Sequence, residues 1–168
     1  AGVECWIVLV PHDPQYLDAD AQAVEIATVN RKTHETRPLK PLPRYKEGKE
    51  RVNWNTPIHV SPTQNGTIYI GSQYLYRTKD FGQTWDRISP DLTTNDATKQ
   101  LQEQSGGVTV DNSAAEMHTT IYALAESPKN PNGIWAGSEC GNPHPPPHGG
   151  KKWQHLPAQL PGPPQATL

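Results

Sequence analysis

The stretch RTKDFGQTW, Arg77–Trp85, comes closest in this chain to a catalytic motif. It places an acidic side chain, Asp80, in a short polar segment with Gly82 and Trp85. A carboxylate there could act as an acid or base, or it could accept N–H groups of its own turn. Gly82 permits the backbone angles of a tight turn, and Trp85 can bury its ring against a neighbouring sheet. The motif supplies no second acid and no nucleophile, so we expect Asp80 to be structural.

Glycoside hydrolysis usually needs two carboxyl groups about 5–10 Å apart, and the chain contains other acidic residues that could supply them. Asp91 and Asp96 flank an expected helix start, where their charge complements the helix dipole, and Asp111 is typical of a turn. Glu116 precedes an expected strand, and His118 shares its face of an extended segment. Glu116 and His118 are therefore the predicted catalytic pair, with a solvated or hydrogen-bonded pair as the alternative.

Several aromatic side chains could stack on a ligand or pack between sheets. They are Trp54, Tyr69, Tyr74, Tyr76 and Trp135. Most lie on expected strands, which favours a place in the core. Trp54 is the exception, because it precedes a strand and is flanked by two amides, Asn53 and Asn55. These three residues are the predicted binding rim for a glycan or a peptide.

The histidines and cysteines do not predict a metal site or a cofactor. Three prolines separate His144 from His148. A polyproline II rise of ~3.1 Å per residue places these imidazoles about 12 Å apart, too far to share one metal ion. The sequence also contains no CxxC, no GxSxG and no phosphate-binding glycine loop. Cys5 and Cys140 leave one disulfide open as an alternative.

The composition excludes several classes of protein. The chain has 168 residues and a net charge of −2, with scattered Lys and Arg, which disfavours nucleic-acid binding. No apolar run approaches the ~20 residues of a membrane-spanning helix. The 18 prolines and 13 glycines favour turns and extended segments. The chain opens on the strand-like CWIVLV without Met or signal peptide, which indicates a processed protein or part of a longer one.

Strand signals occur in short bursts separated by turn residues. The expected strands are Trp6–Val10, Val24–Val29, Ile58–Ser61, Thr67–Ile70, Tyr74–Arg77, Asp86–Ile88, Thr119–Ala125 and Ile134–Gly137. A hairpin turn is expected near Asn30–Thr33, and a longer turn over Ser127–Gly133. One helix is expected over Thr94–Gln104, with Thr94 or Asn95 as N-cap. It falls between strand groups and is interpreted as an insertion.

An internal repeat organises these strands. SPTQNGTIYIGS (Ser61–Ser72) resembles SPKNPNGIWAGS (Ser127–Ser138) at a shift of 66, and Trp85 matches Trp153 at a shift of 68. Each unit predicts four antiparallel strands, and radial repetition of such units makes a β-propeller. The predicted fold is therefore all-β, a partial β-propeller of about three four-stranded antiparallel blades with one short inserted helix.

The repeat also sets expected boundaries. Residues 1–50 form a degenerate first blade, 51–90 the blade that carries the Asp80 motif, 91–118 the insertion, 119–160 a second degenerate blade and 161–168 a Pro-rich tail.

The Asp80 motif resembles the Asp-box, or BNR repeat, Ser/Thr-x-Asp-x-Gly-x-x-Trp. Thr78, Asp80, Gly82 and Trp85 fill it, whereas the later copy keeps only Gly150 and Trp153. RVNWNTPIHVSP, GSQYLYRTKDFGQTWDRISPDLTTND and EQSGGVTVDNSAAEMHTTIYALAESPKNPNGIWAGS also resemble bacterial sortilin/VPS10-like BNR-repeat proteins, often labelled glycosyl hydrolases. The resemblance implies a secreted propeller, in an extracellular or periplasmic location, with the Asp-boxes on the rim.

These observations predict a binding or scaffold module for a protein or glycan ligand. Three blades leave open sheet edges, so we expect the remaining propeller blades or another subunit to complete the ring. The alternative is a glycoside hydrolase of the BNR-repeat type. A sialidase is disfavoured because no copy of the repeat carries an Arg cluster for the substrate carboxylate. A third alternative is a subunit that docks a partner within a larger complex.

Overall fold

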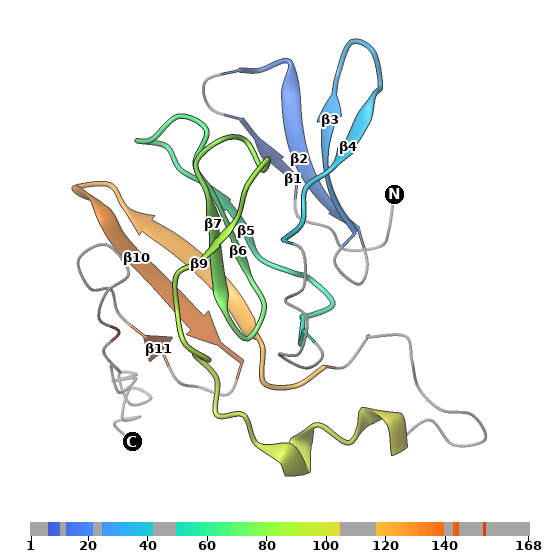
Figure 1. Ribbon diagram of the computed structural model, residues 1–168, viewed down its shortest axis with the longest axis vertical. Coiled ribbons are helices and arrows are strands. Elements are labelled where there is room, and N and C mark those ends of the chain that lie inside the picture. The colour runs from blue at the N-terminus through green and yellow to red at the C-terminus, as the bar shows by residue number, and fades with distance from the viewer. Residues whose placement is uncertain are drawn as a thin grey trace, which may run out of the picture.

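Three antiparallel sheets follow one another along the chain in the computed structural model (Figure 1). The structure describes residues 7–10, 13–21, 25–41, 50–104, 117–139, 143–144 and 153. No helix within these residues is long and apolar enough to cross a membrane.

The first sheet has four strands, each paired with the next in the chain. They are β1 (Ile7–Leu9), β2 (Tyr16–Ala21), β3 (Glu25–Asn30) and β4 (Thr36–Pro38). The sequence did not predict β2. The expected hairpin turn after β3 is present, because the Asn30 side-chain oxygen accepts the amides of Lys32 (2.9 Å) and Thr33 (3.2 Å).

The second sheet is a complete four-stranded meander within the 51–90 segment. Its strands are β5 (Ile58–Val60), β6 (Ile68–Gly71), β7 (Leu75–Thr78) and β8 (Asp86–Arg87). All four residues of β6 are buried, because the neighbouring sheets cover both of its faces.

The third sheet contains β9 (Ile121–Ser127), β10 (Asn130–Ser138) and the two-residue β11 (Pro143–His144), in the order β11-β10-β9. The turn expected over Ser127–Gly133 is shorter than predicted, because β10 already begins at Asn130. A register irregularity between Asn130 and Ile134 accommodates the proline within this strand. The short β11 lies at the edge of the sheet, where prolines are tolerated.

Equivalent serines build equivalent turns in the two copies of the repeat. The Ser61 hydroxyl accepts the amides of Thr63 (3.3 Å) and Gln64 (2.9 Å). The Ser127 hydroxyl accepts the amides two and three residues later, at 3.3 and 3.2 Å. The shift of 66 residues therefore corresponds to a structural repeat.

The inserted helical segment is present as two 3-10 turns, η1 (Ala97–Lys99) and η2 (Gln102–Gln104). Its N-cap is Asp96, in place of the expected Thr94 or Asn95. The Asp96 carboxylate accepts the amide (2.9 Å) and the hydroxyl (2.6 Å) of Thr98, which fixes a local turn. Neither turn buries a residue, so no apolar face supports a longer α-helix.

Two apolar clusters join the sheets. The first lies between the first and second sheets and contains Ile26, Leu39, Ile58, Val60, Ile68 and Ile70. The second lies between the second and third sheets and contains Tyr69, Leu75, Leu92, Ile121, Ile134 and Ala136. Alternate residues of β6 enter opposite clusters, as strand geometry requires.

The first strands of the three sheets are neighbours, since β1 contacts β5 and β5 contacts β9. This arrangement around a common side is that of propeller blades. The described residues thus form a partial β-propeller with two four-stranded blades and a three-stranded third.

The aromatic residues divide between core and surface. Tyr69 and Tyr76 are buried as expected, at 3% and 5% exposure. Trp135 is 44% exposed, so its expected place in the core is wrong. It alternates along β10 with the buried Ile134 and Ala136 and therefore occupies the opposite face of the sheet.

Candidate functional site

The Thr78–Trp85 turn joins β7 to β8 and is held by the Asp80 carboxylate. Asp80 Oδ1 accepts the amides of Gln83 (3.0 Å) and Thr84 (2.9 Å) and the Thr78 hydroxyl (2.6 Å). Asp80 Oδ2 accepts the Thr84 hydroxyl at 2.6 Å. The hydrogen bonds from Thr78 and Thr84 lower the pKa of Asp80 to about 2. Near neutral pH Asp80 is therefore an ionised acceptor that closes its own turn and a poor proton donor.

The same turn packs against the first sheet. Gly82 has φ +81°, and a Cβ at this position would lie 2.0 Å from Leu39 Cδ1. Leu39 is fully buried in the first apolar cluster, and Trp85 packs against that cluster. Gly82 is thus required both by its backbone angle and by the close approach of Leu39.

The second copy of the motif keeps part of this role. Trp153 packs against the second apolar cluster, and its indole N–H donates to the Ile88 carbonyl at 3.2 Å. Trp85 and Trp153 thus contact successive blade interfaces. Gly150 lies outside the described residues.

The predicted binding rim lies on the segment that leads into β5. The Asn53 side-chain amide donates to Thr120 Oγ1 (3.2 Å) and Glu139 Oε2 (3.1 Å), which ties this segment to the third sheet. The Asn53 side-chain oxygen accepts the Asn55 amide at 3.1 Å. Asn55 Oδ1 is buried without a partner among the described residues, and Trp54 is half-buried. The amide of Asn53 is therefore used within the fold.

The predicted catalytic pair is only partly described. Glu116 lies outside the described residues. His118 Nδ1 lies 3.8 Å from Glu139 Oε1, with the two side chains 35% and 24% exposed. Nearby, the Arg51 guanidinium contacts Asp91 at 2.5 Å and donates to the Thr119 carbonyl at 3.2 Å. The structure thus pairs His118 with a carboxylate that the sequence did not single out.

No group of three or more His, Cys, Asp or Glu side chains is arranged to bind a metal ion within the part of the chain that the structure describes. His148, Cys5 and Cys140 lie outside that part of the chain. The alternative of a Cys5–Cys140 disulfide therefore also falls outside the described residues.

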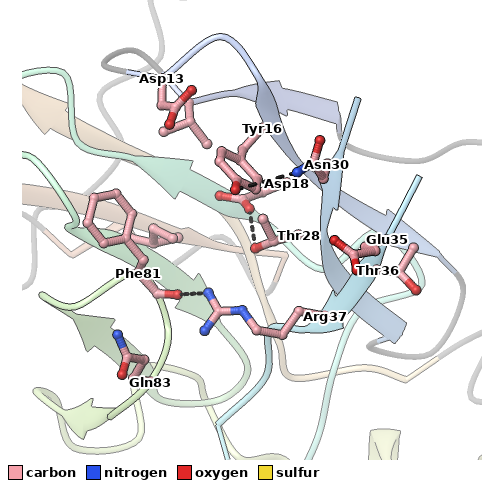
Figure 2. A pocket seen from close by; sticks show the side chains of 12 residues that line it. Asp13, Tyr16, Asp18, Thr28, Asn30, Glu35, Thr36, Arg37, Phe81 and Gln83 are labelled. Atoms are coloured by element: carbon pink, nitrogen blue, oxygen red, sulfur yellow. Dashed lines mark hydrogen bonds between the residues drawn. The ribbon is translucent and has the colours of Figure 1, made fainter. Parts of the chain in front are cut away.

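A cavity of about 710 Å³ lies between the first sheet and the Thr78–Trp85 turn (Figure 2). We call it the interblade pocket. It is lined by Val10, Asp13, Tyr16, Asp18, Thr28, Asn30, Glu35, Thr36, Arg37, Ile68, Phe81 and Gln83. Its volume falls within the ~300–1,000 Å³ of ordinary ligand sites, and it combines apolar walls with a few convergent polar groups.

Strand register explains why polar groups converge there. Asp18 lies opposite Thr28, and Thr28 lies opposite Arg37, so these side chains form one row across the sheet. Tyr16 lies opposite Asn30 in the next row on the same face. The face that buries Ile26 and Leu39 at one end is thus polar at the other.

Asp18 is the most buried polar residue that lines the pocket, at 1% exposure. Its Oδ1 accepts the Thr28 hydroxyl at 2.7 Å. Its Oδ2 is buried and has no partner among the described residues. Burial raises the pKa of Asp18, while the Thr28 hydrogen bond and the charge of Arg37 act in the opposite direction. An orphaned buried carboxylate oxygen is costly and needs an explanation.

Phe81 covers the pocket from the second sheet. It has φ +57° and is 42% exposed. The Phe81 amide donates to the Gly66 carbonyl at 3.0 Å, and the Arg37 guanidinium donates to the Phe81 carbonyl. Figure 2 shows Phe81 and Arg37 beside the space into which Asp18 and Tyr16 project. The Thr78–Trp85 turn therefore supplies a wall of the pocket as well as a blade contact.

The sequence did not point to Asp18 or Phe81. Its one signal was YLDADA, in which an acidic residue occupies the same strand face as Tyr16, next to sheet-forming residues. Without β2, that alternation could not be assigned to an inward face.

No protein-family model and no curated protein sequence matches the chain. A solved structure titled "YCF48 bound to D1 peptide" aligns over 90% of this chain and 84% of its own, with 14% identity and a TM-score of 0.19. The propeller assignment therefore rests on the strand order and blade packing described above.

Proposed function

We propose that this chain is a non-catalytic binding module that holds a protein or peptide ligand at the interblade pocket. The observation that carries the proposal is the buried Asp18 carboxylate, whose Oδ2 lacks a partner among the described residues and which lines a cavity of ligand size. A ligand donor would satisfy that oxygen. In contrast, both carboxylate oxygens of the ionised Asp80 accept hydrogen bonds from its own turn.

The proposal extends to a scaffold role, with further blades as partners. Ile7 and Leu9 on β1 are 67% and 60% exposed, on the sheet face opposite the first apolar cluster. Trp135 is exposed on the outward face of β10. Each end face of the arc thus exposes large apolar side chains. The remaining blades of a ring, or another subunit, would cover them.

We also propose that the chain is an Asp-box protein of the sortilin-like type in an extracellular or periplasmic location. The match of Thr78, Asp80, Gly82 and Trp85 to the motif, and the closed turn that these residues build, support this assignment. The glycoside hydrolase alternative depends on Glu116, which lies outside the described residues.

A paired screen tests the binding function. The full chain is immobilised and probed with a peptide array and a glycan array, and hydrolysis of the same glycans is followed with the wild type and Glu116→Gln. We expect peptide binding without glycan turnover. Glycan hydrolysis that Glu116→Gln abolishes would refute the proposal.

Binding to neither the peptide array nor the glycan array would also refute the proposed binding function. Phe81→Ala is the matching pocket variant, because it removes an exposed ring from the rim. It should weaken binding, whereas Tyr122→Ala removes a similarly exposed ring from β9 and should leave binding unchanged.

A further inference from the structure

The chemistry of the interblade pocket indicates what kind of group it receives. Asp18 Oδ2 belongs to the most buried polar residue of its lining and is an acceptor without a donor among the described residues. A carboxylate at 1% exposure is stable in its charged form only when it is paired. A partner for this oxygen would therefore be a donor, and a positively charged donor would satisfy both the hydrogen bond and the charge.

We call the more exposed end of the pocket its mouth, and it carries charge of the same sign. The exposed Glu35 and the half-buried Asp13 line the pocket together with Asp18, against the single guanidinium of Arg37. The carboxylates at the mouth each accept one local hydrogen bond, from the Gln15 amide (3.1 Å) and from the Thr33 hydroxyl (2.9 Å). The lining residues therefore have a net negative formal charge, which attracts a cation and repels an anion.

The walls between the mouth and Asp18 suit a hydrocarbon stem. Val10 and Ile68 contribute aliphatic surface, and Tyr16 and Phe81 contribute rings. Lys and Arg side chains bury methylene groups along such walls and carry the charge at the far end. Aromatic faces add a favourable interaction with the cation.

We infer that the interblade pocket binds a lysine or arginine side chain of a peptide or protein partner, with Asp18 as its counter-ion. This inference rests on the proposed binding function and names the ligand chemistry of that site. The ammonium or guanidinium donates to Asp18 Oδ2, while the Thr28 hydroxyl holds Oδ1 in place. Asn30 and Tyr16 form the adjoining polar row and lie beside the bound lysine or arginine side chain.

The test is calorimetric titration of the full chain with four acetylated, amidated pentapeptides that differ only in the central residue. The central residues are Lys, Nε-acetyl-Lys, Arg and citrulline, so each cation has a neutral isostere. We expect the Lys and Arg peptides to bind at least tenfold more tightly than their isosteres. Asp18→Asn should abolish that selectivity.

Two further variants guard against loss of folding and against general charge effects. Glu35→Lys changes an exposed residue at the mouth, so it should fold and weaken the Lys and Arg peptides selectively. Asp86→Asn removes an exposed carboxylate on β8 that does not line the pocket, and it should leave all four affinities unchanged.

Equal binding of cationic and neutral peptides, or full selectivity in Glu35→Lys, would overturn the inference and leave the broader binding function standing. No binding of any of the four peptides at millimolar concentration would overturn the inference. If the peptide and glycan arrays were also negative, the proposed binding function would be refuted as well.

Discussion

Gly82→Ala tests how the Thr78–Trp85 turn fixes the first blade against the second. At φ +81° an alanine costs about 1–2 kcal/mol relative to glycine. Its Cβ would also lie 2.0 Å from Leu39 Cδ1, in a cluster where Leu39 is fully buried. Forcing such a contact apart costs about 1–3 kcal/mol. We therefore expect the free energy of unfolding to fall by about 2–5 kcal/mol.

Urea unfolding followed by tryptophan fluorescence and circular dichroism measures this change in free energy. In thermal unfolding the Tm should drop by about 4–20 °C. Gly137→Ala is the matched control, because its Cβ would meet only Ala123 Cβ at 3.8 Å. That variant should be unchanged or more stable by up to about 1 kcal/mol.

Leu39→Ala separates the steric cost from the backbone cost. Alone it should destabilise by about 2–5 kcal/mol, because it opens a cavity in the first apolar cluster. Combined with Gly82→Ala, the total loss should fall short of the sum by about 1–3 kcal/mol, because the clash is gone. Strict additivity, or a Gly82→Ala variant as stable as the wild type, would refute the proposed packing of this turn.

Three pH-dependent predictions follow from the shifted pKa values, each measured as Tm against pH. The hydroxyls of Thr78 and Thr84 lower the pKa of Asp80 to about 2, so the stability that its carboxylate contributes is complete above pH ~4 and is lost as the pH falls through about 2. Asp80→Asn should therefore have a lower Tm at pH 7 and a smaller drop in Tm on acidification. An unchanged Tm would contradict this. Burial lowers the pKa of His59, whose Nε2 accepts a backbone amide at 3.2 Å; stability should decline as the pH drops below ~6.5, and His59→Phe should remove that decline. Burial raises the pKa of Asp18, so the protonated carboxyl favours the folded protein at low pH, and this contribution to stability is lost as the pH rises through the pKa of the folded state. Asp18→Asn should therefore raise the Tm at pH 7, and a lower Tm would indicate a purely structural carboxylate.

The sequence was a good guide where local chemistry decides the structure. Ser61 and Ser127 cap equivalent turns, and Trp85 and Trp153 pack at successive blade interfaces, as the repeat predicts. Asp80 holds its turn through contacts with residues no more than four positions away, which a motif can encode. The all-β, partial propeller fold follows from these local signals.

The interblade pocket could not be predicted, because it depends on pairing and packing between distant segments. Asp18 faces inward only because β2 pairs with β3 in one register, and a slip of one residue would turn it outward. Phe81 reaches the pocket through a left-handed backbone and a hydrogen bond to Gly66. Trp135 was misplaced for the same reason, since alternation alone does not say which face is covered.

Backbone NMR tests most directly whether a ligand is held at the interblade pocket. The isotope-labelled chain is titrated with the pentapeptide that has a central lysine. We expect the largest amide shift changes at Asp18, Thr28 and Phe81, and we expect Asp18→Asn to remove them. Shift changes centred on Trp54 and His118 instead, or none at saturating peptide, would contradict it.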